Sequence, residues 1–152
     1  MDGIFVASPF SLQTDFMDVV RIEVLRGPQG TLFGQNSTGG AINVITKAPS
    51  VDEFSGKADL TLGSDYDYTK FRATFNIPVS DSVATRFAMS STKHDGFTEN
   101  VFNGQDLDDA DSISARIRFL YQPSETFRAN FTAQIFDENR NGSAQKGLLD
   151  TT

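Results

Sequence analysis

The chain has 152 residues, a formal net charge of −7, 38% hydrophobic residues and no cysteine. The lack of cysteine excludes disulfides, thiolate chemistry and cysteine-ligated metals, and the acidic balance argues against a general nucleic-acid binder. No run of about 18 apolar residues occurs, so a membrane-spanning helix is excluded, whereas a membrane barrel, whose strands are only half apolar, is not.

The first distinctive segment is rich in glycine and runs from Val20 to Lys47. Apolar residues alternate in Val20–Val24 and again in Ile42–Thr46, which predicts two strands, because side chains in a strand alternate between faces. Glycines between these strands allow positive φ angles or a close approach of the backbone. They are Gly27, Gly30, Gly34, Gly39 and Gly40. The segment therefore predicts a strand–turn–strand unit that is shaped by its backbone.

Five further segments of about ten residues alternate apolar and polar side chains, a pattern typical of antiparallel strands. They are Phe54–Leu62, Lys70–Val79, Val83–Lys93, Ser112–Tyr121 and Phe127–Phe136. These segments are longer than the roughly 5–6 residues of most soluble strands. Their length matches the roughly 9–11 residues that cross a bilayer when a strand is tilted.

The connections between these strands alternate in length. Short turns are expected at Ser80–Ser82 and Gln122–Glu125, where serine and proline favour turns, whereas Gly63–Tyr68 and His94–Asp111 are longer. Short turns on one edge and longer loops on the other are typical of bacterial outer-membrane barrels. From this pattern alone, a soluble β-sandwich with one solvated face stays open as the alternative.

Basic residues occupy the polar faces of the five strands, while most acidic residues lie in the connections. A basic side chain that faces lipid near the bilayer centre of a barrel costs about 2–4 kcal/mol. We therefore expect these basic groups to face a wet or protein-filled interior. They are Lys57, Lys70, Arg72, Arg86, Arg116, Arg118 and Arg128.

No set of catalytic residues and no cofactor motif can be placed, so we do not expect an enzyme. The acidic run Asp106–Asp111 lacks the glycine and the glutamate of an EF-hand loop, which favours a solvated loop over a calcium site. His94 is the only histidine, and a single histidine cannot build a zinc site without partners. The sequence predicts neither a metal nor a cofactor.

Three stretches of the glycine-rich segment resemble the C-terminal part of the plug domain of TonB-dependent outer-membrane receptors. They are Arg21–Pro28 (RIEVLRGP), Gly30–Gly34 (GTLFG) and Gly39–Lys47 (GGAINVITK). In that family the plug is followed directly by the first strand of the barrel, and the same order is expected here. The upstream Asp2–Val6 resembles the plug strand that precedes this motif.

The resemblance implies a mainly β fold, in which a large transmembrane antiparallel barrel of about 22 strands closes around a plug. Residues 1–48 would be the C-terminal part of the plug, and residues 54–152 would supply about five barrel strands. The family implies active uptake across the outer membrane of Gram-negative bacteria, of ferric siderophores above all, with cobalamin or glycans as alternatives. The implied partners are outer-membrane lipid, an external ligand such as an iron chelate, and the TonB–ExbB–ExbD complex; no nucleic acid is implied.

The sequence departs from the family pattern at both ends, because the TonB box, the first half of the plug and most barrel strands are absent. No secretory signal follows Met1 either. An open sheet edge cannot lie in lipid, so we expect this chain to be a fragment of a longer receptor. A porin-like passive channel and a soluble β-rich binding module are the competing hypotheses.

Within the plug motif, the charged residues and the glycines have different expected roles. By resemblance, Arg21 and Arg26, with Glu23, take part in contacts between plug and barrel; an exposed pair on a plug strand is the alternative. Asn43 belongs to the same motif. Pro28 and the five glycines are expected to set the shape of the segment and not to contact ligand.

Overall fold

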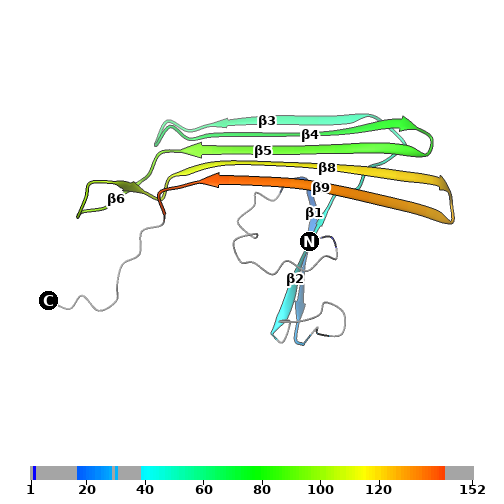
Figure 1. Cartoon of the computed structure of the whole chain (residues 1–152), viewed down its shortest axis with the longest axis horizontal. Coiled ribbons are helices and arrows are strands. Elements are labelled where there is room, and N and C mark those ends of the chain that lie inside the picture. The colour runs from blue at the N-terminus through cyan, green and yellow to red at the C-terminus, as the bar shows by residue number, and fades with distance from the viewer. Residues whose placement is uncertain (1, 3–16, 29, 31–38, 143–152) are drawn as a thin grey trace.

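The computed structural model describes residue 2, residues 17–28, residue 30 and residues 39–142 (Figure 1). In this part of the chain the fold is mainly β, with nine strands in three antiparallel sheets. No helix among the described residues has the length and apolarity needed to cross a membrane. The expected mainly β fold is confirmed.

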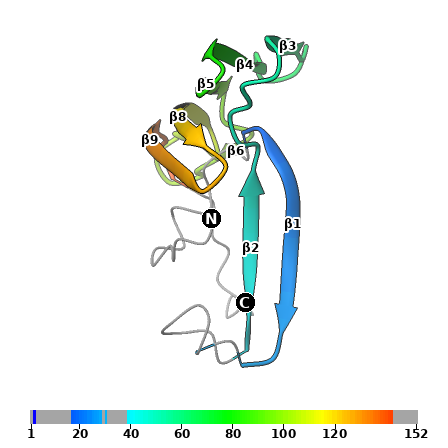
Figure 2. The ribbon, with the colours of Figure 1, turned by 90° about the vertical axis from the view of Figure 1, so that its right-hand side faces the viewer.

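The glycine-rich segment forms a two-stranded hairpin that projects away from the main sheet (Figure 2). Its strands are β1 (Val19–Arg26) and β2 (Gly40–Thr46). Ile22 pairs with Val44 and Val24 with Ile42, so the alternating apolar residues share one face, and the predicted strand–turn–strand unit is confirmed. The predicted strand Asp2–Val6 lies outside the described residues except for Asp2, whose backbone N–H donates to the Val44 carbonyl at 2.9 Å.

The main sheet has five long strands, all antiparallel to their neighbours, in the order β3-β4-β5-β8-β9. They are β3 (Ser55–Leu62), β4 (Thr69–Ser80), β5 (Val83–His94), β8 (Ala110–Ser124) and β9 (Phe127–Asn139). All five predicted strands are confirmed. The turn predicted at Gln122–Glu125 is wrong in extent, because β8 continues through Pro123 to Ser124, with a register shift between Tyr121 and Ser124 that accommodates the proline.

The long connection between β5 and β8 contains a small hairpin that the sequence did not predict. Its strands are β6 (Thr98–Glu99) and β7 (Asp106–Leu107). Beside it, the imidazole of His94 stacks between Tyr68 and Phe97, with ring centroids 6.0 and 6.1 Å away. His94 is therefore a half-buried residue that packs between two aromatic rings.

The two faces of the main sheet are opposite in character to those of a soluble sheet. One face is apolar and exposed: Ile117 is 50% exposed, Phe131 65% and Ile135 68%. The other face is polar, and it is buried where the hairpin lies against it: Asn76 is 2% exposed and Arg116 3%. In water such an apolar face would be covered, so this arrangement suits a sheet whose outer face meets lipid.

Aromatic side chains pair across β8 and β9 on the apolar face. The ring centroids of Phe119 and Phe131 lie 6.4 Å apart, and those of Tyr121 and Phe127 lie 6.2 Å apart. The second pair is at the short-turn end of the two strands, where a membrane barrel carries a girdle of aromatic residues at the lipid–water interface.

Candidate functional site

The candidate site is the junction where the base of the β1–β2 hairpin meets the polar face of the main sheet. Its centre is a row of three side chains on neighbouring strands, which we call the wall row: Asn76, Arg86 and Arg118. Asn76 pairs with Arg86 in the β4–β5 register, and Arg86 pairs with Arg118 in the β5–β8 register. Residues paired in this way project from the same face, so the sheet brings the three side chains together although they are far apart in sequence.

Arg86 holds the hairpin through a two-pronged ion pair with Asp18, the residue before β1. The Arg86 Nε donates to Asp18 Oδ2 at 2.5 Å, and Nη2 donates to Oδ1 at 2.6 Å. The Arg86 side chain is buried and that of Asp18 nearly so, with 6% and 11% of their surface exposed. The backbone of Asp18 has a φ of 55°, a left-handed conformation that aspartate adopts more readily than most residues. Paired guanidinium–carboxylate bonds of this kind are strong and directional.

Arg116 reinforces the same end of the hairpin from the neighbouring strand. Its Nη2 donates to the backbone carbonyl of Met17 at 2.5 Å. Both side chains are almost fully buried. Arg86 and Arg116 together therefore fix the chain at the entrance to β1 through one side-chain and one backbone acceptor.

Arg118 holds the other strand of the hairpin at the end of β2. Its Nη1 donates to Thr46 Oγ1 at 2.8 Å and lies 3.7 Å from Asp2 Oδ2. Asp2 in turn accepts from the backbone N of Thr46 at 2.8 Å and from its hydroxyl at 2.7 Å. The end of β2 is thus held between a wall arginine and a carboxylate from the start of the chain.

Asn76 completes the wall row by binding the segment that connects β2 to β3. Its Nδ2 donates to the carbonyls of Ser50 and Glu53 at 2.9 and 2.7 Å, and its Oδ1 accepts from the Ser50 N–H at 2.9 Å. One buried amide therefore satisfies three backbone groups, and it fixes the path from hairpin to sheet.

Replacing Asn76 by alanine should loosen this connection, because three backbone groups lose their partner. Each buried polar group left without a hydrogen bond costs about 1–3 kcal/mol. In the full-length protein we expect trypsin to cut after the exposed Lys47 about tenfold faster or more, since about 1.4 kcal/mol corresponds to a factor of ten in opening. Asn130→Ala on the exposed part of β9 is the control. Equal cleavage of both variants would contradict the anchoring role of Asn76.

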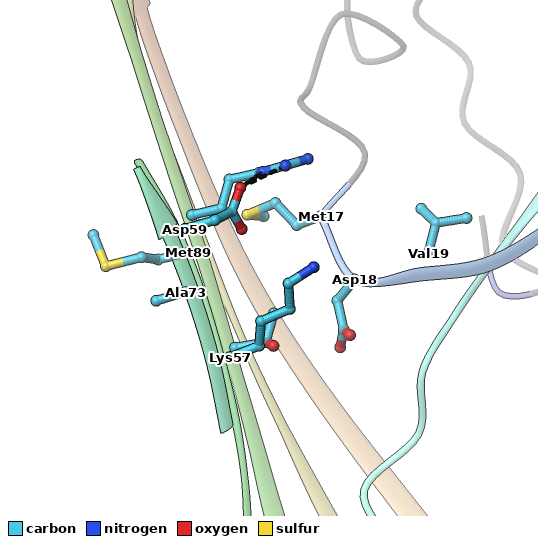
Figure 3. Close-up of a pocket in the computed structure, with 9 residues that line it drawn as sticks. Met17, Asp18, Val19, Lys57, Asp59, Ala73 and Met89 are labelled. Atoms are coloured by element: carbon cyan, nitrogen blue, oxygen red, sulfur yellow. Dashed lines mark hydrogen bonds and ion pairs between the residues drawn. The ribbon is translucent and has the colours of Figure 1, made fainter. Parts of the chain in front are cut away.

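A hollow of about 310 Å³ lies beside the wall row, between the entrance to β1 and strands β3 and β4. Figure 3 shows Lys57 and Asp59 of β3 pointing toward the segment that carries Met17 and Asp18. Asp59 accepts from Arg72 Nε at 2.8 Å and Nη2 at 2.5 Å. The lining therefore carries charges of both signs.

The charged residues of the plug motif lie on the hairpin itself. Arg21 Nε donates to Glu23 Oε1 at 2.7 Å, and Asn43 Nδ2 donates to Glu23 Oε2 at 3.1 Å. These bonds, that from Arg21 first, lower the pKa of Glu23 from its ordinary value. Among the described residues these contacts stay within the hairpin, and the expected role of Arg21, Glu23 and Arg26 at the barrel wall stays a prediction.

Two of the motif glycines have positive φ angles, which glycine adopts without strain. Gly27, directly after β1, has a φ of 82°. Gly40, at the start of β2, has a φ of 138°, and a Cβ there would lie 2.4 Å from the Leu25 carbonyl oxygen. A side chain at either position would strain the hairpin. Gly34 lies outside the described residues, and at Gly30 and Gly39 an added Cβ would meet no atom within 4 Å. The shape-setting role of these glycines and of Pro28 stays a prediction.

The seven predicted basic residues do not all meet the hairpin. Arg86, Arg116 and Arg118 hold it, whereas Lys57 and Arg72 line the hollow. Arg128 is exposed next to the β8–β9 turn, and Lys70 is half-buried near the outer end of β4. That this face lines the interior of a closed barrel stays a prediction.

Most residues that form the junction with the arginines were not singled out by sequence. Asp18 and Met17 carry no motif, Asp2 and Thr46 were noted only as members of plug-like segments, and Asn76 is one polar residue among several on its strand. A charge argument was available: a face with many buried arginines needs acidic partners from another segment. The acidic run in the long loop is not that partner, and among the described residues no group of acidic or histidine side chains is arranged to hold a metal ion.

Comparison with known proteins gives several bacterial receptors as relatives. The ferric enterobactin receptor PirA of Pseudomonas aeruginosa is 28% identical over 157 residues, which cover 88% of this chain and 21% of that receptor. The pesticin receptor of Yersinia pestis is 34% identical over 85 residues, covering 55% of this chain and 12% of the receptor. The iron-regulated outer membrane virulence protein of Vibrio cholerae is 27% identical over 136 residues, covering 84% and 20%.

The chain spans at most about a fifth of the length of these relatives, since it covers 21%, 12% and 20% of them. No family model matches the chain. No solved structure matches it either.

Proposed function

We propose that this chain, which belongs to the TonB-dependent outer-membrane receptors, forms the junction between plug and barrel in a receptor for active uptake. In this proposal residues 1–48 are the C-terminal part of the plug and residues 54–152 are the first barrel strands. A connecting segment without strand structure supports that division, because β2 ends at Thr46 and β3 begins at Ser55.

The observation that carries the proposal is the buried contact between the hairpin and the polar face of the sheet. A passive channel needs a water-filled interior at this face. Here the guanidinium groups of Arg86 and Arg118 instead donate hydrogen bonds to Asp18, just before β1, and to Thr46 of β2. A segment that fills the inner face while the outer face is apolar is what a plugged barrel requires.

The exposed apolar face and the sheet edges support a location in the outer membrane as part of a larger barrel. In the described part of the chain, β3 and β9 each have a neighbouring strand on one side only. Unpaired backbone groups at such edges cannot lie in lipid. Further strands must therefore pair with β3 and β9 in the membrane, which supports the interpretation of this chain as a piece of a longer protein.

The proposed ligand is an iron chelate of the siderophore class. The names of the relatives support it, because one is a receptor for ferric enterobactin and another is an iron-regulated outer membrane protein. The basic residues on the inner face would attract an anionic chelate. In this proposal the ligand binds from outside, and the TonB–ExbB–ExbD complex supplies the energy that displaces the plug.

The two competing functions make different predictions about uptake. A porin-like channel would pass ligand without an energy source, and a soluble binding module would not require a membrane. The exposed apolar face disfavours the soluble module, and the filled inner face disfavours the porin. The buried Arg86–Asp18 pair at the base of the hairpin also disfavours the porin, because it fills the face that a channel would leave open to water.

The full-length protein, expressed in a Gram-negative host that lacks its own ferric enterobactin receptor, tests the proposal. Radioactive iron given as ferric enterobactin should accumulate in cells with a functional tonB gene and stay at background without it. Labelled cobalamin serves as the second ligand. Accumulation of either ligand to the same level without TonB would contradict active uptake and favour a passive channel. No accumulation of either ligand would overturn the assignment to these ligands.

A further inference from the structure

We propose that the three guanidinium groups of Arg86, Arg116 and Arg118, named here the arginine cluster, form an anion-binding site. At rest this site is filled by the carboxylates of Asp18, just before β1, and Asp2, beside the end of β2. When the hairpin moves away, the same site would take carboxylate or phenolate groups of a small anionic ligand. The first statement rests only on the geometry of the junction. The second also rests on the proposed function, because it needs a plug that moves.

The charges of the arginine cluster need an anion at all times. Arg86 and Arg118 are directly opposite each other on β5 and β8, where like charges repel. Their side chains are only 6% and 13% exposed, so water does little to screen them. Asp18 bonds to Arg86, and Asp2 lies 3.7 Å from Arg118. Without these two carboxylates, the cluster would be a buried concentration of positive charge.

The hairpin does not use all the hydrogen-bond donors of the cluster. Within the described part of the chain, the Nε of Arg118 is buried and has no hydrogen-bond partner. The ion pair of Arg118 with Asp2 is also longer than a hydrogen bond, at 3.7 Å. A wall shaped only to hold the hairpin would satisfy this donor, since a buried unpaired N–H costs about 1–3 kcal/mol. The surplus donor therefore points to an anion with more oxygen atoms than the hairpin provides.

The geometry also sets the chemical class of the ligand. Arg86 binds the Asp18 carboxylate with two parallel bonds of 2.5 and 2.6 Å. A guanidinium presents this fork to planar groups with two adjacent anionic oxygens. Carboxylates fit it, and so do paired phenolate oxygens. Hairpin and ligand would thus compete for the same donors, so ligand in the site would delay the return of the hairpin.

Chemical rescue in the full-length protein tests the anion site without any transport assay. Asp18→Ala removes the carboxylate and leaves room for a small anion next to Arg86. We expect this variant to have a lower melting temperature in chloride, and a melting temperature that rises with the logarithm of acetate concentration at constant ionic strength. Acetamide, which has the shape of acetate but no charge, should not produce the rise. If the variant folds only in acetate, the yield of folded protein in acetate, compared with that in chloride, tests the same expectation.

Two further variants show whether the rescue is specific to the cluster. Asp18→Ala combined with Arg86→Met should lose the response to acetate. Asp59→Ala, which removes the carboxylate next to the more exposed Arg72, should respond no more to acetate than the unaltered protein does. Acetate that is no more effective than chloride on Asp18→Ala would overturn the anion site. Rescue in a protein that transports no ligand would leave the site standing and overturn only the proposed function.

Citrate tests the second statement, because it offers several carboxylates to the surplus donor. In Asp18→Ala, citrate should act at a concentration at least about tenfold lower than acetate, which corresponds to about 1.4 kcal/mol of additional binding. This advantage should shrink in Asp18→Ala combined with Arg118→Met. Equal potency of citrate and acetate would contradict a site that accepts a larger anionic ligand.

Discussion

Arg86→Met should lower the free energy of unfolding of the full-length protein by about 3–5 kcal/mol, the usual cost of removing one partner from a buried ion pair. The reason is that Asp18, with only 11% of its side chain exposed, would stay buried without its two hydrogen bonds. Urea denaturation in detergent micelles measures the change, and the Asp18→Asn variant should lose a similar amount. The double variant should lose less than the sum of both, because the two residues interact directly.

Arg72→Met is the matched control for this prediction. Arg72 also binds a carboxylate, that of Asp59, but the two side chains are 48% and 32% exposed. Ion pairs at such exposure contribute about 0–1 kcal/mol. If Arg72→Met and Arg86→Met had the same effect, the junction would be no more than a surface contact, and the role assigned to the wall row would be wrong.

Ile117→Lys should destabilise the membrane-inserted protein by about 2–4 kcal/mol, the depth-dependent cost of a lysine facing lipid near the bilayer centre. Ile117 lies near the middle of β8 on the apolar face, where it is 50% exposed. The lysine would have to reach the interface or take its charge into hydrocarbon. The folding equilibrium in lipid vesicles, with denaturant as the variable, measures the cost.

Asn130→Lys is the control on the opposite face of the neighbouring strand. Asn130 is exposed and pairs with Leu120 in the β8–β9 register, so its side chain projects from the polar face and does not lie directly opposite an arginine. We expect a change of less than about 1 kcal/mol, since surface substitutions of this kind have small effects. A larger cost for Asn130→Lys than for Ile117→Lys would mean that the two faces have been assigned the wrong way round.

The sequence was sufficient to predict the five strands of the main sheet, because their alternation of apolar and polar residues is long and regular. Phe71, Phe75 and Ile77 alternate with polar residues along β4, and such a pattern defines a strand and its two faces without any tertiary information. The strands β6 and β7 have only two residues each, too few to show an alternation that would predict a strand. The extension of β8 past Pro123 depends on a register shift, which only the pairing with β9 reveals.

The junction itself could not be predicted from the sequence, because its contacts are long-range. Arg86 and Asp18 are separated by 68 positions, and Arg118 and Thr46 by 72. Alternation placed the arginines on one face, yet it could not say what covers that face. Alternation alone describes equally well a soluble sheet with the opposite burial. The basic side chains were the sequence signal that the polar face looks inward, and the position of the hairpin shows which part of that face is buried.

A nitroxide scan along β8 tests the central claim, that the apolar face meets lipid while the polar face meets the hairpin. The chain has no cysteine, so single cysteines for spin labelling can be introduced one at a time from residue 111 to residue 121 of the full-length protein in lipid vesicles. Collision with oxygen, which concentrates in lipid, should peak at Ile113, Ala115, Ile117 and Phe119 and be lowest between them, with a period of two residues. Peaks at the intervening positions, or equal access of a water-soluble relaxation agent to both sets, would contradict the claim.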